Sequence, residues 1–563
     1  MRSPYGNFFA TKAGTAALVT MPDVDTGARG TCTVYCVSMN VDANHDGNMD
    51  LSFNGADATS ASSPDRVWVN NGYILPGSNG SLDQDKPLPL NDPNSANSAY
   101  GTITCQRDLE NFFRLWICGM PSALSNQNYY ATLSCTAISG SPAINLYYAE
   151  TNGGTGYLTD TNVAASLVGE SKLATISPTS PFVIPFWLYN GSNLNFLFEG
   201  AGVGEGQFTL TIYQNGNVIA QTSAFIDLHD VKDFFEQDVI QDNMSGAKSN
   251  WTSYVEAVLP AIASGLGNDT NMIVLVHGIN VRPWDCIDDA GTVCKRLYWA
   301  GFQGKFAEVE WPCNLLTPKP SPFSPAVFND SELQGYKAST ALTTCLNGLK
   351  TRFPNYRLNI LAHSQGNTVV SEAIKQGFTS FDTYILTQGA LPDSAYDVNA
   401  PTNATLLTLD GVYPTPEWQP MGYHGVYTNL PGRIVNFYNP NDPVLDWWVT
   451  DQELLKPSVY IIGSIYNYDG TNSYFNPEFG SGYLVTDPEE SRADVSRSRT
   501  LPIGQSGPSS AHGVIQSAVD LYANFGFYNA FPADHSAQWT WPIQTTRPYF
   551  QQVLRSCQII PAP

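Results

Sequence analysis

The sequence predicts an α/β protein in which a doubly wound, mostly parallel sheet follows an all-β, sandwich-like domain. A chain of 563 residues is too long for one hydrophobic core, which indicates two or three domains. Before residue 230, short β-branched and aromatic runs are separated by Gly, Asn and Ser. Beyond it, apolar strands alternate with helical patterns. We therefore expect an all-β accessory domain over residues 1–229 and an α/β domain over residues 230–563.

The accessory domain is expected to consist of short strands joined by turns. The pair Asn215-Gly216 is typical of a hairpin turn between two of these strands. Residues 107–117 are predicted as a helix. The predicted strands are residues 32–40, 66–69, 129–137, 143–148, 182–189, 207–213 and 218–226.

Strands and helices alternate in the second domain, which implies a parallel sheet with helices on both faces. The charged stretch 230–238 is predicted as a linker helix. Residues 393–430 are too long for a turn and rich in Pro, Thr and Asn, so we expect a cap or lid. The predicted strands are residues 272–276, 358–361, 384–387 and 434–438, and the predicted helices are residues 332–352 and 367–375.

Composition and charge exclude some classes of partner. The formal net charge of −23 repels nucleic acid and anionic membranes, and we expect partners of neither kind. No apolar run reaches the 18 residues or so that a membrane span needs. We expect this charge to keep the protein soluble, and the attraction of cations such as calcium is the alternative.

The ten cysteines bear on the cellular compartment. An even number suits disulfides in an oxidising compartment, and Cys32–Cys36 and Cys286–Cys294 are the nearest pairs. Buried free thiols are the alternative. The first residues lack the apolar core of a signal peptide, so the signal has been removed or the protein is cytosolic. The cysteines favour a secreted or periplasmic protein.

The stretch 358–367 places a serine between a buried strand and a helix. Ser364 would then lie on a sharp turn that projects its Oγ outward, at the positive N-terminal end of the helix. Strand and helix approach each other closely at such a turn, which requires small residues two before and two after the serine. Ala362 and Gly366 meet this requirement.

This turn resembles the nucleophile elbow of α/β-hydrolases, with alanine in place of the first glycine of G-x-S-x-G. Its His-Ser-Gln-Gly sequence is similar to that of bacterial lipases. The pair His277-Gly278, after the strand at 272–276, resembles the oxyanion-hole loop of the same enzymes. The resemblance covers roughly residues 230–563. It implies that the N–H groups of Ile279 and Gln365 form the oxyanion hole and that His277 supports the loop.

The same resemblance implies an acid and a base after the nucleophile, in the chain order Ser, Asp, His. Asp442 follows the strand at 434–438 and is the expected acid, with Asp446 as the fallback. Only His512 and His535 come later in the chain. We prefer His535, which precedes a last helix near 546–557 and follows an expected strand within 522–531. His512 is the alternative base.

The resemblance therefore implies a serine esterase or lipase that cleaves carboxylic esters through an acyl-enzyme and needs no catalytic cofactor. An acyltransferase of the same fold is one alternative. A non-catalytic surface or binding protein that retains the hydrolase fold is another.

A second motif lies in the accessory domain. Asp42, Asn44, Asp46 and Asp50, with the backbone carbonyl of Asn48, are spaced to surround one cation, and Gly47 permits the sharp turn. The motif resembles the calcium loops of EF-hands and dockerins. Its twelfth position is Phe53 instead of a bidentate Glu, and Asp57 is a substitute. We expect a structural calcium site, with an ordinary Asx-rich turn as the alternative.

Overall fold

In the computed structural model the described residues fall into two compact units, with the division of the chain between Val231 and Lys232. The structure describes residues 37–45, 47–48, 50, 55–69, 109–120, 128–149, 155–160, 162–163, 171–188, 193–243, 251–261, 265–313, 325–391, 396, 427, 430–442, 444–445, 459–461, 464–466, 503–505, 507, 514–527, 533–540 and 543–561. Among these residues no helix is long and apolar enough to cross a membrane.

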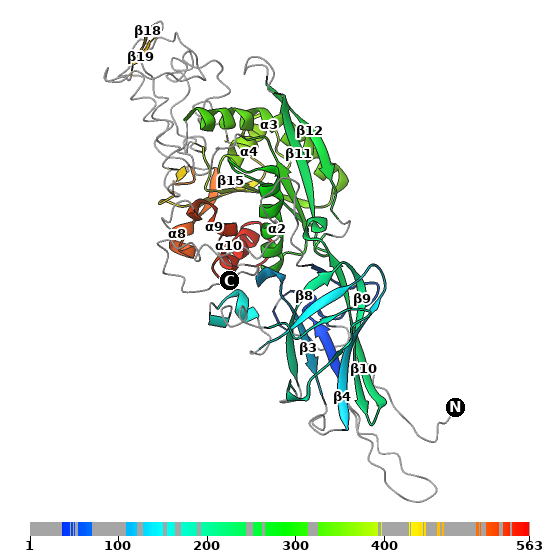
Figure 1. Ribbon diagram of the computed structural model, residues 1–563. Helices are drawn as coiled ribbons and strands as arrows, with labels where there is room; N and C mark the ends of the chain where they lie inside the picture. Colours follow the sequence, from blue (N-terminus) through cyan, green and yellow to red (C-terminus); the bar gives the residue numbers. More distant parts are fainter. Residues whose placement is uncertain are drawn as a thin grey trace, which may run out of the picture. The chain divides into compact units, whose positions relative to one another are not determined.

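The first unit contains two five-stranded sheets (Figure 1). One has the order β1 (Ser38–Val41), β3 (Phe113–Cys118), β8 (Leu194–Gly202), β5 (Ala143–Tyr148), β6 (Ala174–Ile176). The other has the order β2 (Asp65–Trp68), β10 (Asn217–His229), β9 (Gly204–Gln214), β4 (Tyr129–Ala137), β7 (Phe182–Val183). All pairs are antiparallel except β2 with β10. Trp68 of one sheet packs edge-on against Phe113 of the other, with ring centroids 4.9 Å apart.

Two predictions for this unit are wrong. Residues 107–117 form a single 3-10 turn, Leu109–Asn111, followed by β3. The buried apolar residues of β3 alternate along a strand that pairs with both β1 and β8, so tertiary pairing overrides local helix preference. The strand predicted at 182–189 stops at Val183, and a 3-10 turn follows at Phe186–Leu188. Pro185 lacks the N–H that a longer strand would have to donate.

The second unit is built on an eight-stranded sheet in the order β12, β11, β14, β13, β15, β16, β17, β20. All neighbours are parallel except the edge strand β12. The strands are β11 (Phe235–Asn243), β12 (Thr252–Leu259), β13 (Asn271–Val276), β14 (Lys305–Glu310), β15 (Arg357–His363), β16 (Thr383–Thr387), β17 (Arg433–Tyr438) and β20 (Ile515–Asp520). A separate hairpin joins β18 (Val459–Ile461) to β19 (Ser464–Tyr466).

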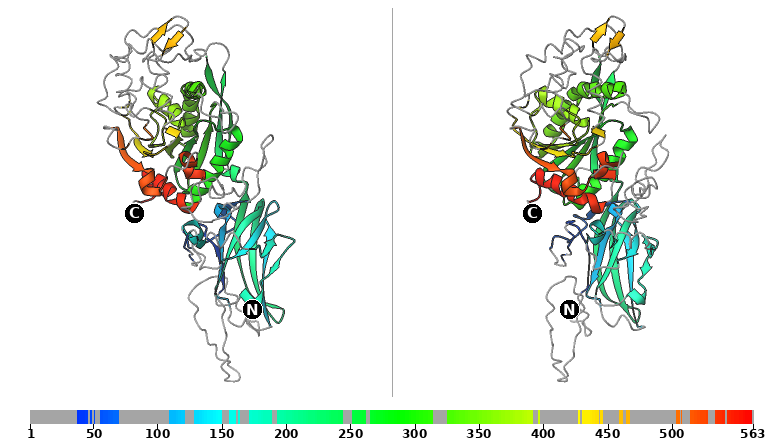
Figure 2. Two further views of the ribbon diagram at one scale, coloured as in Figure 1. Left: turned by 60° about the vertical axis from the view of Figure 1, so that its left-hand side comes forward. Right: turned by 90° about the vertical axis from the view of Figure 1, so that its left-hand side faces the viewer.

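Helices cover both faces of this sheet (Figures 1 and 2). On one face, α3 (Pro325–Arg352) and α4 (Gly366–Lys375) share an apolar core with alternate strand residues such as Ala307 and Leu386. The intervening strand residues face the other helices. Cys286 of α2 (Pro283–Trp299) donates to Glu308 of β14, and Tyr549 of α10 (Ile543–Ser556) donates to Thr387 of β16. Short helices η13 (Ala533–Ser536) and α9 (Ala537–Thr540) precede α10.

Two predictions for the second unit need correction, and a third falls outside the described residues. Residues 230–238 form one 3-10 turn, Val231–Phe234, and then enter β11, because β11 pairs with both β12 and β14. The last strand is β20, not a strand within 522–531. Helix α8 (Leu521–Phe525) follows β20, because the Asp520 side chain accepts a hydrogen bond from Ala523 N–H and caps the helix. The segment 393–430 lies outside the described residues except for Tyr396, Tyr427 and Leu430.

The expected Cys286–Cys294 disulfide is also wrong. Both thiols are free and lie on α2, about 12 Å apart along the helix axis, whereas bridged cysteines have Cα atoms roughly 4–7 Å apart. Five other described cysteines are free thiols as well: Cys118, Cys135, Cys313, Cys345 and Cys557. Cys32 and Cys36 lie outside the described residues.

Candidate active site

Ser364 lies at the junction of β15 and α4, where the chain turns from strand to helix. Its φ is +51°, a left-handed conformation that costs a non-glycine residue about 1–2 kcal/mol. The turn is held from both sides. Ser364 N–H donates to the Thr387 carbonyl at 3.1 Å, and Ala390 N–H donates to the Ser364 carbonyl at 3.1 Å. The end of β16 thus stabilises a strained serine next to a helix N-terminus, at the sharp turn that the sequence predicts for Ser364.

The loop that follows β13 packs directly against this turn. A Cβ at Gly366 would lie 2.4 Å from the carbonyl oxygens of both Val276 and His277. A Cβ at Gly278 would lie 2.9 Å from the Cβ of Ser364. Real Cβ atoms do not approach so closely, so both positions require glycine. The N–H groups expected to form an oxyanion hole, those of Ile279 and Gln365, therefore belong to segments that meet at Ser364.

His277 supports this loop and does not project into the site. Its Nδ1–H donates to the Gly278 carbonyl at 2.8 Å, and its Nε2 accepts from Trp311 N–H at 3.1 Å. The Trp311 indole in turn donates to the His277 carbonyl at 2.7 Å. Burial lowers the pKa of His277 to about 4, so the ring stays neutral, as this hydrogen-bond pattern requires.

Asp442 and His535 form a buried pair although 93 residues separate them. His535 Nδ1 donates to Asp442 Oδ2 at 2.7 Å. The other carboxylate oxygen accepts from the N–H groups of Val444, at 2.9 Å, and Leu445, at 3.2 Å. Gln388 Nε2 also donates to Oδ2, at 2.7 Å. Four donors therefore hold a carboxylate that is fully buried, and one of them is an imidazole.

His363, the residue before Ser364, connects the elbow to this pair. Its Nε2–H donates to the backbone carbonyl of His535 at 2.6 Å, and the two imidazole centroids are 4.7 Å apart. Trp539 packs edge-on against the His363 ring at 4.6 Å. Burial holds the pKa of His363 well below its usual range, so the ring remains a neutral donor. Sequence reasoning gave neither His363 nor Gln388 a role of its own. His363 entered only as part of the His-Ser-Gln-Gly sequence, and Gln388 belongs to no recognised motif.

The imidazole of His535 has one nitrogen still available. His535 Nε2 is buried and has no hydrogen-bond partner, so the contact to Ser364 that a general base would make is not formed. Contacts of this kind are often long in the absence of substrate and tighten when it binds. The alternatives weighed from the sequence, His512 and Asp446, lie outside the described residues.

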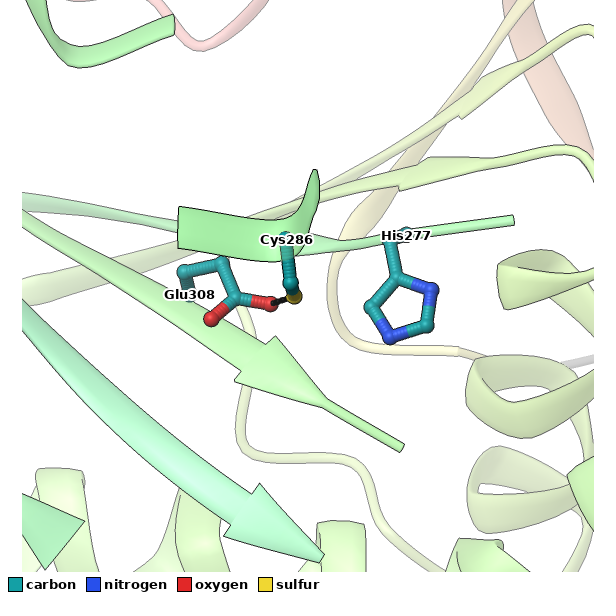
Figure 3. Close-up of side chains that lie close together, drawn as sticks. All are labelled: His277, Cys286 and Glu308. Atoms are coloured by element: carbon teal, nitrogen blue, oxygen red, sulfur yellow. Dashed lines mark hydrogen bonds between the residues drawn. The ribbon is translucent and has the colours of Figure 1, made fainter. Parts of the chain in front are cut away.

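The side chains of His277, Cys286 and Glu308 lie close together (Figure 3). They come from the loop after β13, from α2 and from β14. The three side chains are buried, and their ligand atoms lie within 4.8 Å of one another. The Cys286 thiol donates to a Glu308 carboxyl oxygen, and burial raises the pKa of both groups well above their usual values. Because both nitrogens of His277 are already hydrogen-bonded, the cluster fits a protonated core contact better than a metal centre.

In the first unit, the Asp42 carboxylate contacts other parts of the expected calcium loop and the side chain of Arg114. Asp42 Oδ2 accepts from Gly47 N–H at 3.2 Å and pairs with the buried guanidinium of Arg114. Arg114 also donates to the Gly47 carbonyl at 2.8 Å. Asp42 Oδ1 is buried and has no hydrogen-bond partner, and burial raises the pKa of this carboxyl group. An orphaned buried carboxylate oxygen fits a bound cation.

Asp57 braces the same loop. Its carboxylate accepts from the N–H groups of Asp50, at 2.7 Å, and Asn44, at 3.4 Å. Asn44, Asn48 and Asp50 lie in the described part of the loop, whereas Asp46 lies outside it. Asp57 therefore links the backbone near the start of the loop, at Asn44, to the backbone at its end, at Asp50.

One family model matches part of the chain. Residues 262–385, from just before β13 into β16, match the family described as "Alpha/beta hydrolase of unknown function (DUF900)". The matched region includes the His277-Gly278 loop and the turn at Ser364. It supports an α/β-hydrolase fold for the second unit. No curated protein matches the sequence.

Several solved structures are similar to this chain at low identity. A thermostable esterase is 12% identical, with 80% of this chain and 96% of that chain covered and a TM-score of 0.27. A monoacylglycerol lipase from Paleococcus ferrophilus is 11% identical, with 50% and 97% covered and a TM-score of 0.21. A putative aryl esterase from Burkholderia cenocepacia is 10% identical, with 52% and 93% covered and a TM-score of 0.24.

Proposed function

We propose that the protein is a serine hydrolase that cleaves carboxylic esters, with Ser364 as nucleophile, His535 as general base and Asp442 as its carboxylate partner. One observation carries the proposal. An imidazole and a buried carboxylate, 93 residues apart, are hydrogen-bonded at 2.7 Å, and the residue before a strained serine binds the backbone of that same histidine. The match of residues 262–385 to an α/β-hydrolase family supports the same conclusion.

The chemistry follows from these positions. His535 Nε2 accepts the proton of Ser364 Oγ as the oxygen attacks the ester carbonyl. The N–H groups of Ile279 and Gln365 stabilise the oxyanion that forms. Asp442 holds Nδ1 protonated, so the imidazolium can give its other proton to the leaving alcohol. Water then repeats these steps and releases the acid from the acyl-enzyme.

Labelling with a fluorophosphonate tests the nucleophile directly. We expect one covalent adduct, located by peptide mass spectrometry on Ser364, and turnover of a p-nitrophenyl ester. Ser364→Ala should lose both. Ser380→Ala, at an exposed serine after α4, is the matched control and should retain both. Equal turnover by Ser364→Ala and the wild type would exclude Ser364, and absence of label and turnover in the wild type would favour a non-catalytic protein.

The base is tested by separate exchanges. His535→Ala should lose turnover, because it removes the only described partner of the Asp442 carboxylate that can transfer a proton. His512→Ala should retain turnover. The opposite result would assign the base to His512.

We also propose that the loop from Asp42 to Asp50 binds a structural calcium ion. Asp42 Oδ1, buried without a partner, supports this proposal. Calcium should raise the melting temperature and EDTA should lower it, since a ligand at a hundred times its Kd stabilises by about 2.7 kcal/mol. Asp42→Asn should abolish the response. Asp160→Asn, in the same unit but outside the loop, should retain it. A wild-type melting temperature that is equal in calcium and EDTA would contradict the proposal.

A further inference from the structure

Two neighbouring strands of the sheet end on strained residues. β15 and β16 are parallel, and His363 pairs with Thr387. The next residue on each strand, Ser364 and Gln388, has a positive φ, +51° and +48° respectively. Glutamine rarely adopts this conformation. A strained backbone conformation persists where contacts with the surrounding structure hold it in place, and such conformations are frequent at functional sites.

The backbone around Gln388 is held on several sides. Gln388 N–H donates to the Phe437 carbonyl at 2.9 Å, and Gly504 N–H donates to the Gly389 carbonyl at 2.9 Å. A Cβ at Gly389 would lie 2.8 Å from Ile503 Cγ2. The Gln388 side chain is fully buried. The left-handed turn therefore directs this amide to one fixed place.

That place is the carboxylate of Asp442. Gln388 Nε2 donates to Asp442 Oδ2 at 2.7 Å, and the same oxygen accepts the Nδ1–H of His535 at 2.7 Å. The amide donor thus competes with the imidazole for one oxygen. The N–H groups of Val444 and Leu445 hold the other oxygen, Oδ1. With Oδ2 held by the Gln388 amide as well, the carboxylate group cannot rotate freely.

We propose that Gln388 is a positioning residue, which orients Asp442 toward His535 and moderates the basicity of the shared oxygen. This inference rests on the proposed function of Ser364, His535 and Asp442. An N–H donated to a carboxylate disperses its charge. With the donor removed, Asp442 stabilises the His535 imidazolium more strongly, so a higher pH is needed to keep His535 neutral and active as a base.

Two other titratable groups among the described residues contact His535 or the end of β16 next to Gln388. His363 of β15 lies with its ring centroid 4.7 Å from that of His535, and Tyr549 of α10 reaches Thr387 Oγ1 at 3.2 Å. Burial lowers the pKa of His363 and raises the pKa of Tyr549, which keeps both groups neutral. A shift in the acidic limb of activity therefore reports on Asp442 and His535.

The test replaces Gln388 and measures the pH dependence of kcat and kcat/KM on a p-nitrophenyl ester. Gln388→Met retains the length of the side chain but removes the amide. We expect kcat to fall between about tenfold and a hundredfold with little change in KM, since small misplacements at a reacting centre have effects of this size. The acidic limb of kcat/KM should move up by roughly one pH unit.

Gln388→Gly separates this role from structural support. Glycine adopts a positive φ without strain, so the melting temperature of Gln388→Gly should equal or exceed that of Gln388→Met. The kcat of Gln388→Gly should nevertheless fall as much as that of Gln388→Met, because both variants lack the amide. Gln558 offers a matched control, because it is an exposed glutamine with a φ of +58°. Gln558→Met and Gln558→Gly should leave kcat and the pH profile unchanged.

The outcomes distinguish the two proposals. If the wild type turns over the ester and is labelled on Ser364, but the pH profile of Gln388→Met overlays that of the wild type, the role of Gln388 is refuted. If the wild type is neither labelled nor active, the proposed function itself fails.

Discussion

A side chain at Gly278 would collide with Ser364: the Cβ position of Gly278 lies 2.9 Å from the Ser364 Cβ and 3.0 Å from His363 Nδ1. The loop after β13 and the turn after β15 are therefore packed backbone against backbone. The loop after β13 cannot move without displacing the turn after β15. The segment that carries the Ile279 N–H is therefore fixed relative to Ser364.

Gly278→Ala should consequently impair the site more than the fold. The added methyl group displaces the loop or the serine, and a displacement of about 1 Å at a reacting centre can lower the rate by roughly a hundredfold. The measurement is kcat/KM together with the rate of fluorophosphonate labelling. Gly348→Ala, in the interior of α3 with no atom near its Cβ position, is the control and should stabilise by about 0.8–1 kcal/mol with activity unchanged. Normal activity in Gly278→Ala would show that the loop is not part of the site.

Asp442→Asn should preserve the fold and lower kcat by roughly 10⁴-fold, the size of effect seen when a neutral amide lets a catalytic histidine adopt the wrong tautomer. His535 Nδ1 would then face an amide instead of a carboxylate. Rates on a p-nitrophenyl ester, with a melting curve for each protein, measure this. A variant within tenfold of the wild type would remove Asp442 from the mechanism.

Asp65, in the first unit, should make stability depend on pH. Burial raises the pKa of Asp65 to about 7, so the folded state retains a proton that the unfolded chain loses near pH 4. Stability contributed by this group is therefore lost as pH rises from about 4 to 7, by on the order of 4 kcal/mol in total. Asp65→Asn lacks the ionisation. Melting temperatures of both proteins are measured in EDTA, which removes calcium. The difference between Asp65→Asn and the wild type, in favour of the variant, should grow with pH and become constant above about pH 7. A constant difference would contradict the assignment.

Cys286 and Cys294 should both carry free thiols in the native protein. Alkylation after unfolding without reductant should modify both residues, and peptide mapping should find no Cys286–Cys294 cross-link. The physical reason is their separation along α2, which exceeds the span of a disulfide. Recovery of that cross-linked peptide would require α2 to be unwound at this place.

Features encoded locally could be predicted from the sequence. The strands at Tyr129–Ala137 and Ala143–Tyr148 have the predicted bounds, because apolar and polar residues alternate in them between clear turn residues. The strand and helix on either side of Ser364 were also predicted, within two residues at each end. Patterns that suit both a helix and a strand were misassigned at 107–117 and 230–238. There the pairing with neighbouring strands decided the outcome.

The sequence alone determined the alternation of strands and helices and the strained turn at Ser364, since both follow from neighbouring residues and their periodicity. Together with the chain order that the resemblance to α/β-hydrolases implies, it also limited the candidate bases to His512 and His535. Only the tertiary structure brought Asp442 to His535, directed His363 to the backbone of His535 and placed the Gln388 amide on the shared carboxylate oxygen. These contacts join residues 54 to 172 positions apart. Hydrogen-bond geometry between such distant residues depends on how the strands are ordered in the sheet, and no local pattern records it.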